Sequence, residues 1–180
     1  MSRRPHLRGF QVALLVLGVG AGSLSLWGCA SSGFDGRVYH DASMRFRVGP
    51  IPSTWRGITV DDTLLAFRDD SQNATVALNG RCGLDGDDVP LASLTQHLFL
   101  QFTDREPLAR QTLTLDGREA LRTEINASLD GVKERYLVYV LKKDGCVYDF
   151  MYITAPSDSA AAAGSSAEFE RFVQGFSTLE

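Results

Sequence analysis

Side chains able to perform catalysis are few in this 180-residue sequence. His40 is followed directly by Asp41, and His97 lies within a series of leucines. An imidazole near a carboxylate or a serine hydroxyl could act in acid–base or nucleophilic catalysis, and it could also bind a metal ion. No Gly-x-Ser-x-Gly elbow accompanies either histidine. We therefore interpret both as ordinary boundary residues, and we predict that the protein is not an enzyme and has no catalytic residues.

The densest acidic segment is Asp85-Gly86-Asp87-Asp88. Calcium needs several oxygen ligands, and a glycine permits the tight loop that surrounds such an ion. The segment lacks the twelve-residue spacing and the final glutamate of a calcium-binding loop. The alternative is a solvated loop in which Asp88 caps a helix that begins near Pro90. We predict this second arrangement, and therefore neither a metal site nor a cofactor.

Residues 1–28 have the pattern of a signal peptide. Arg3, Arg4 and Arg8 give a basic start without an acid, and residues 10–26 are apolar but interrupted by glycine and serine. A retained transmembrane helix would need about 20 consecutive, mostly apolar residues, which the glycine- and serine-rich second half does not provide. We predict that this leader is removed during export, by either the general secretory or the twin-arginine route.

The segment Leu26-Trp27-Gly28-Cys29 closes the apolar run. It resembles the Leu-x-Gly-Cys lipobox of bacterial lipoproteins, with Trp27 where that family usually has a small residue. The resemblance implies that Cys29 becomes the mature N-terminus and carries a thioether-linked diacylglycerol and an amide-linked acyl chain such as palmitate. Each buried methylene contributes about 0.8 kcal/mol, so more than one chain gives a stable anchor. Ala30 in place of aspartate implies sorting to the outer membrane, facing the periplasm, with residues 29–36 as a lipidated tether.

Acylation of Cys29 leaves Cys82 and Cys146 as an even pair in an oxidising compartment. A disulfide between them would close a loop of about 65 residues and contribute roughly 4 kcal/mol by constraining the unfolded chain. A metal-binding pair and a redox dithiol are the alternatives. Neither cysteine lies in a Cys-x-x-Cys motif, and no histidine is near either of them in sequence. We therefore predict a structural disulfide.

The mature chain is acidic. Without the leader about 150 residues remain, enough for one core, and we predict a single domain over residues 37–180. This mature part has 15 basic and 22 acidic residues, a net charge of −7. An acidic surface disfavours nucleic acid and anionic lipid head groups as partners. We expect contact with the bilayer through the acylated Cys29 and not through a basic patch.

Three Asp-Gly pairs divide the second half of the chain: Asp116-Gly117, Asp130-Gly131 and Asp144-Gly145. Asp-Gly favours the two-residue type I′ hairpin turn, so we predict a four-stranded antiparallel meander over residues 108–154. Turns of this length fix the register of the strands. The predicted pairs are Ile125 with Tyr136, Leu121 with Val140 and Val138 with Met151 on one face, and Leu141 with Tyr148, Tyr139 with Phe150 and Leu137 with Tyr152 on the other.

Both faces of this meander are apolar, so the sheet needs cover on both sides. Apolar residues at helical spacing predict one helix after Pro90 and a second over residues 167–176. The two stripes are Leu91, Leu94, Leu98 and Phe102, and Phe169, Phe172, Val173 and Phe176. We expect residues 157–164 to be a mobile connector and Ser165 or Ser166 to cap the second helix.

Alternating runs over residues 37–40 and 44–48, and over residues 64–68 and 74–78, predict two hairpins before the first helix. Asp149 interrupts an apolar face of the meander. We expect it to pair with Arg118, Arg122 or Lys142, or to lie at the rim of the sheet.

A hairpin that ends in Pro52-x-x-Trp55, two more strands, a helix, a meander and a terminal helix resemble the PsbP-like superfamily. Residues 88–91, 117–121 and 142–149 resemble its small bacterial lipoproteins. The superfamily also includes the extrinsic photosystem II protein and a nuclear-transport factor that binds a Ran-type GTPase. The resemblance implies an α+β fold in which helices cover both faces of an antiparallel sheet, an α/β/α sandwich. It also implies a binding or assembly role, without catalytic residues to carry over.

We therefore predict a lipid-anchored protein of the bacterial cell envelope that serves as a non-catalytic binding or assembly factor for another envelope protein. The alternative is a periplasm-facing carrier of a small ligand or cation. A pocket lined by Trp55, Tyr139, Tyr148 and Tyr152 would favour the carrier. A filled core with an exposed apolar patch would favour the protein partner.

Overall fold

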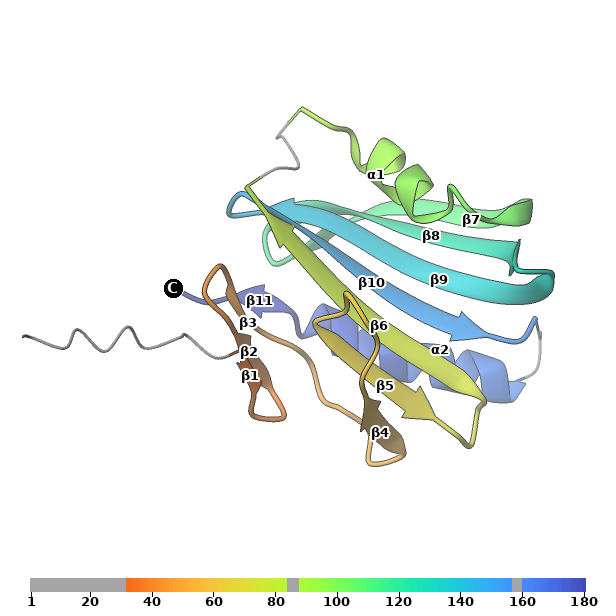
Figure 1. Ribbon diagram of the computed structural model, residues 1–180, viewed down its shortest axis with the longest axis horizontal. Helices are drawn as coiled ribbons and strands as arrows, with labels where there is room; N and C mark the ends of the chain where they lie inside the picture. Colours follow the sequence, from red (N-terminus) through yellow and green to blue (C-terminus); the bar gives the residue numbers. More distant parts are fainter. Residues whose placement is uncertain (1–31, 84–87, 157–159) are drawn as a thin grey trace, which may run out of the picture.

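The structure is a computed structural model that describes residues 32–83, 88–156 and 160–180 (Figure 1). The predicted leader, Cys29 and the acidic residues 85–87 lie outside the described residues. The elements in chain order are β1 (Gly33–Phe34), β2 (Val38–His40), β3 (Arg45–Arg47), β4 (Trp55–Ile58), β5 (Leu65–Asp69), β6 (Ala74–Cys82), α1 (Leu91–Leu98), β7 (Thr103–Leu115), β8 (Arg118–Leu129), β9 (Val132–Lys143), β10 (Cys146–Thr154), α2 (Ala160–Gln174) and β11 (Ser177–Thr178).

Among the described residues, seven strands form an antiparallel sheet in the order β4-β5-β6-β10-β9-β8-β7. Its last four strands are the predicted meander, and all six predicted cross-strand pairs are found. The aspartates of the three turns have φ of 48°, 50° and 53°, and the glycines that follow have φ of 73°, 81° and 74°. Positive φ at both central residues is what a type I′ turn requires. The turn chemistry therefore sets the register, as predicted.

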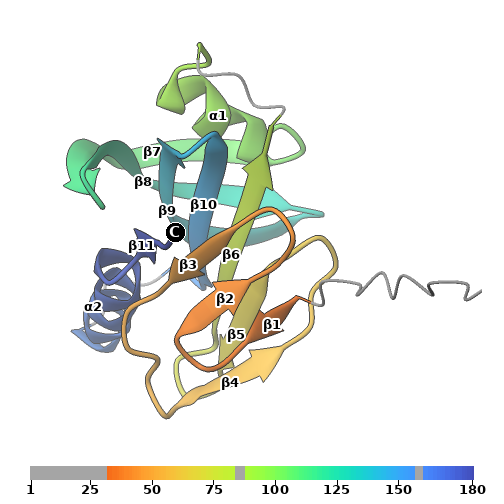
Figure 2. The same cartoon turned by 90° about the vertical axis from the view of Figure 1, so that its left-hand side faces the viewer.

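One face of the large sheet is covered by α2 together with a second, smaller sheet (Figures 1 and 2). The predicted hairpin β2–β3 belongs to this smaller sheet, whose order among the described residues is β1-β2-β3-β11. Phe46 of β3 is fully buried and stacks with Tyr39 at a ring-centroid distance of 5.0 Å. The predicted helical stripe Phe169–Phe176 is buried on the same face. The sandwich is therefore confirmed in part, because one of its layers combines a helix with a sheet that we did not predict.

Helix α1 lies on the other face, with Leu94 and Phe99 buried against β8 and β9. The helix ends at Leu98, so Phe102 lies beyond it. The rings of Phe99 and Phe102 nevertheless meet Tyr136 edge-on at 5.5 Å and 5.2 Å. The expectation that Asp88 caps α1 is wrong. The N-cap is Pro90, which makes no side-chain cap hydrogen bond.

Helix α2 begins at Ala160. The expected connector over residues 160–164 is therefore helical, and Ser165 and Ser166 lie inside the helix and do not cap it. Alanine has the highest helix propensity, so an alanine-rich segment extends the helix backwards from its packed end. Residues 157–159 lie outside the described residues.

The end of α2 packs backbone to backbone against the segment between β3 and β4. The N–H of Gly49 donates to the carbonyl of Phe172 at 2.8 Å. A Cβ on Gly49 would lie 2.2 Å from the carbonyl oxygen of Arg171, and one on Gly175 would lie 2.2 Å from the Cα of Gly49. Glycine at both positions is what allows this close approach.

The buried tyrosines predict how stability depends on pH. Burial raises the pKa of Tyr39, Tyr139 and Tyr148 to about 12, above the value of about 10 for a solvated tyrosine. Ionisation therefore favours the unfolded chain. The stability these phenols contribute is complete below about pH 10 and is lost as the pH rises towards 12. We predict a steep fall in Tm over that range, measured by circular dichroism. Tyr148→Phe should make the fall shallower, and identical slopes for variant and parent would contradict this prediction.

Candidate interaction site

The end of the molecule that contains the β8–β9 turn exposes apolar side chains. Leu129 and Val132 flank this turn as cross-strand partners and are 38% and 59% exposed. Leu100, in the loop between α1 and β7, is 67% exposed. We call Leu100, Leu129 and Val132 the apolar end. The α1–β7 loop and the β8–β9 turn both lie at the right of Figure 1, away from the small sheet.

Aromatic packing holds this end in place. Phe99 and Phe102, on either side of the exposed Leu100, contact each other at 5.1 Å and both contact Tyr136 of β9. Packing of these two rings on Tyr136 fixes the loop, and Leu100 beside Phe99 is exposed. Apolar side chains on a fixed backbone lose little conformational entropy on binding, which suits them to contact a partner protein.

A polar hollow of about 450 Å³ lies on the α2 side of the sheet, between α2 and strands β7–β9. Arg122 of β8 donates to Glu170 of α2 at 3.0 Å and 3.1 Å and to the hydroxyl of Tyr139 at 3.2 Å. The Tyr139 hydroxyl also lies 3.3 Å from the same carboxylate oxygen of Glu170. Gln111, Leu113 and Gln174 complete much of the lining.

The charges in this hollow compensate each other. Burial alone would lower the pKa of Arg122, but the hydrogen bond that it donates to Glu170 and its contact with Tyr139 raise that pKa above its ordinary value. Burial, with the charge of Glu170 in addition, raises the pKa of Tyr139 to about 12, so the phenol stays protonated at neutral pH. The hollow therefore offers polar contacts and no activated nucleophile or base.

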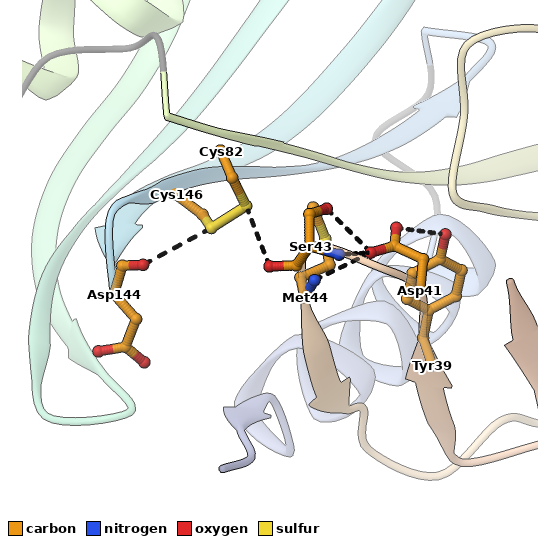
Figure 3. Close-up of a disulfide and its surroundings, with 7 residues drawn as sticks. All are labelled: Tyr39, Asp41, Ser43, Met44, Cys82, Asp144 and Cys146. Atoms are coloured by element: carbon orange, nitrogen blue, oxygen red, sulfur yellow. Dashed lines mark hydrogen bonds between the residues drawn. A yellow bond between two sulfur atoms is a disulfide. The ribbon is translucent and has the colours of Figure 1, made fainter. Parts of the chain in front are cut away.

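The predicted pair Cys82 and Cys146 forms a disulfide in the structure (Figure 3). The two cysteines are direct cross-strand partners in β6 and β10, 64 residues apart in sequence. The sulfur of Cys82 lies 3.8 Å from the carbonyl oxygen of Ser43 in the β2–β3 turn. Asp41 holds that turn by accepting the N–H groups of Ser43 and Met44. The bridge therefore lies where the two sheets meet.

The other residues singled out from the sequence do not converge on one site. His40 is exposed at the end of β2, His97 is exposed on α1, and Asp88 is exposed before Pro90. The described residues contain no group of three or more His, Cys, Asp or Glu side chains able to hold a metal ion. Within the same part of the chain, no helix is long and apolar enough to cross a membrane.

Asp149 is almost fully buried, at 1% exposure. It accepts a hydrogen bond from the side chain of Asn79 at 3.2 Å and lies 3.7 Å from Arg81. Both contacts come from β6, the strand beside it. The sequence could not show which strand lies there, so neither residue was among the partners we predicted.

The pocket that would favour a carrier is filled. Trp55, Tyr139, Tyr148 and Tyr152 are each at most 6% exposed and belong to one aromatic core. Side chains of α2 and of the residues just after it occupy the space between them: Phe172 of α2 meets Trp55 at 5.6 Å, and Phe176, beyond the helix, meets Tyr148 at 4.9 Å. The polar hollow and the apolar end were missed from the sequence. The flanks of the Asp130-Gly131 turn, both apolar, were the one local signal for the apolar end.

The sequence matches no protein-family model and no curated protein. Solved structures do resemble it. The solution structure of CyanoP, the cyanobacterial PsbP of Synechocystis sp. PCC 6803, matches 88% of this chain and 99% of its own, with 17% identity and a TM-score of 0.56. The chain has the PsbP-like fold. The resemblance in fold, inferred from the order of the elements, is thereby confirmed.

Two further structures share the PsbP-like fold. Mog1p of Saccharomyces cerevisiae, a Ran-binding protein, matches 82% of this chain and 95% of its own, with 9% identity and a TM-score of 0.53. LpqN of Mycobacterium tuberculosis, involved in cell envelope biogenesis, matches 83% and 90%, with 14% identity and a TM-score of 0.52. At these identities the similarity concerns the fold.

Proposed function

We propose that this protein is an envelope lipoprotein, acylated at Cys29, that acts as a non-catalytic binding or assembly factor for another envelope protein through its apolar end. The main observation behind this proposal is that the aromatic core is fully packed while Leu100, Leu129 and Val132 are exposed. Isolated exposed apolar residues are common on protein surfaces. Here three of them lie in or beside two connections at the same end of the molecule, and the rings of Phe99 and Phe102 pack on Tyr136 and hold one of these connections in place.

The fold neighbours support a binding role in the envelope. Mog1p is a Ran-binding protein, and LpqN is involved in cell envelope biogenesis. The lipobox at residues 26–29 is an independent argument for a location in the envelope. Ala30, which follows it in place of aspartate, is the argument for the outer membrane, with the domain facing the periplasm.

A carrier of a small polar molecule is the second candidate, and the hollow beside Arg122 and Glu170 favours it. A ligand there would exchange hydrogen bonds with Gln111 and Gln174, because the arginine and the glutamate already neutralise each other. Ligand pockets are usually apolar with a few convergent polar groups. This hollow is mostly polar, so we place the partner protein first.

Cross-linking in native membranes followed by mass spectrometry tests the proposed function. Val132→Asp puts a charge at the centre of the apolar end, and we predict that it lowers the yield of the cross-linked complex about tenfold or more, as expected at a binding hot spot. Val60→Asp is the matched control, because Val60 is 42% exposed but lies in the segment between β4 and β5. Both variants should keep the free energy of unfolding within about 0.5 kcal/mol of the parent. Equal yields from both variants would contradict the assignment of the apolar end.

A further inference from the structure

The two free edges of the large sheet differ in length. One edge strand, β4, has four residues, and the other, β7, has thirteen. Every residue of β7 from Thr103 to Thr112 is exposed, and in the described residues β7 pairs with β8 alone. A long free edge presents a row of unused N–H and C=O groups to any other strand, and proteins usually block such edges.

Blocking features occupy one half of β7. Its pairing with β8 is irregular between Thr103 and Glu106 and between Pro107 and Ala109, and Asp104 has a φ of 47°. From Ala109 to Leu115 the pairing is regular, without proline or a bulge. Bulges and prolines protect an edge from pairing, so the second half of β7 remains open.

The β7–β8 turn identifies the open backbone groups. In a two-residue hairpin the flanking residues, here Leu115 and Arg118, form a hydrogen-bonded pair, and such pairs recur at every second residue. The odd-numbered residues of β7 therefore face β8. Arg110, Thr112 and Thr114 turn their N–H and C=O groups away from the sheet.

This edge is complementary to a second copy of itself. An antiparallel pairing with Thr112 on the two-fold axis places Thr112 opposite Thr112 of the copy, and Arg110 opposite Thr114. Cross-strand threonine pairs are favourable, and like charges directly opposite each other are not. This register keeps the two Arg110 side chains apart, and Arg110 is the one charged residue between Ala109 and Leu115.

The symmetry also suits the anchor, a step that rests on the proposed acylation of Cys29. A two-fold axis between antiparallel edge strands is perpendicular to the sheet, so both copies present the same face to the same side. The small sheet, which contains β1, packs on the α2 face of the large sheet (Figure 2). Three residues separate Cys29 from Gly33, a reach of about 14 Å. The tethers of both copies therefore leave from one side, where a single bilayer can hold them.

We propose that two copies pair through residues 109–115 of β7 to form one continuous antiparallel sheet, with both lipid anchors in the same membrane. Confinement to a bilayer raises the effective concentration of the copies and favours this pairing. The apolar end remains outside the paired half of β7, so each copy can still bind its partner.

A cysteine pair tests the register in native membranes. Thr112→Cys places two thiols across the axis, at the Cα separation of about 5.5 Å of a hydrogen-bonded pair, which a disulfide can span. Arg110→Cys is the matched control, since the register sets its two copies four residues apart, about 13 Å. We expect covalent dimers from Thr112→Cys to form about tenfold faster or more than from Arg110→Cys, because a disulfide cannot bridge that distance. Equal rates, or no dimer from either, would overturn the proposal.

A second variant separates pairing from folding. Thr112→Pro removes an N–H that points away from β8, so the ladder of the folded chain keeps its bonds. The acylated parent should sediment as a dimer in mild detergent and the variant as a monomer with an unchanged circular dichroism spectrum. A monomeric parent would overturn the pairing.

If Thr112→Cys resists maleimide in native membranes yet forms no homodimer, another protein occupies the edge and the second copy is excluded. If Cys29 is not acylated, the intact mass of the protein shows it. The comparison of Thr112→Cys with Arg110→Cys still tests the register in that case.

Discussion

Replacing Cys29 by alanine should move the protein from the membrane fraction to the soluble fraction without unfolding the domain. The sulfur of Cys29 is the proposed attachment point of the diacylglycerol, and several acyl chains together give effectively stable anchoring. Within residues 32–83, 88–156 and 160–180, no helix is long and apolar enough to span a bilayer. The mature chain carries a net charge of −7, so electrostatic attraction to anionic lipids does not compensate either. Fractionation measures the release from the membrane, and intact-mass spectrometry measures the loss of the lipid.

Trp27→Ala is the control for this experiment, because it restores the small residue usual at that lipobox position. Its product should keep the mass of the acylated parent and remain in the membrane fraction. Membrane association of Cys29→Ala at the parental level, or a parental mass without added lipid, would contradict the lipoprotein assignment.

Replacing Cys82 by serine should lower the free energy of unfolding under oxidising conditions by roughly 4 kcal/mol, because the bridge constrains a long loop in the unfolded chain. The cysteines are 64 residues apart in sequence and are direct partners in adjacent strands. For a domain of this size the corresponding loss in Tm is about 10 °C. Urea unfolding with and without a reductant measures the difference.

The double variant Cys82→Ser/Cys146→Ser distinguishes loss of the bond from exposure of a single thiol. It should be destabilised to the same extent as Cys82→Ser. With dithiothreitol present, the parent should approach both variants. If the parent and Cys82→Ser melt at the same temperature in the absence of reductant, the bridge does not stabilise the fold.

The meander could be predicted from the sequence because its information is local. Asp116, Asp130 and Asp144 each precede a glycine, and both residues of each pair have a positive φ, as a two-residue turn requires. A turn of that length allows only one register between the strands that it joins. Six cross-strand pairs follow by counting along the chain. The buried stripe of α2 could also be predicted, since Phe169, Phe172 and Val173 recur at helical spacing.

The contacts between distant segments could not be predicted in this way. Pairing of β3 with β11 joins Phe46 to Thr178 across most of the chain, and no local pattern indicates it. The ion pair of Arg122 with Glu170 likewise depends on how α2 crosses β8. The same limit applied to the contacts of Asp149 with Asn79 and Arg81, which both lie on β6. The cap expected from Asp88 failed for a local reason: the N-cap position falls on Pro90, whose side chain cannot accept a hydrogen bond, and Asp88 lies two residues before it.

Strand β3 lies between β2 and β11, so the small sheet joins the beginning of the domain to its last residues. A chain that is synthesised from its N-terminus cannot complete this sheet until Ser177 and Thr178 have followed. Until then Phe46 lacks the ring of Phe176, which it meets at 5.5 Å in the folded protein. The small sheet is therefore completed last, when β11 becomes available to pair with β3.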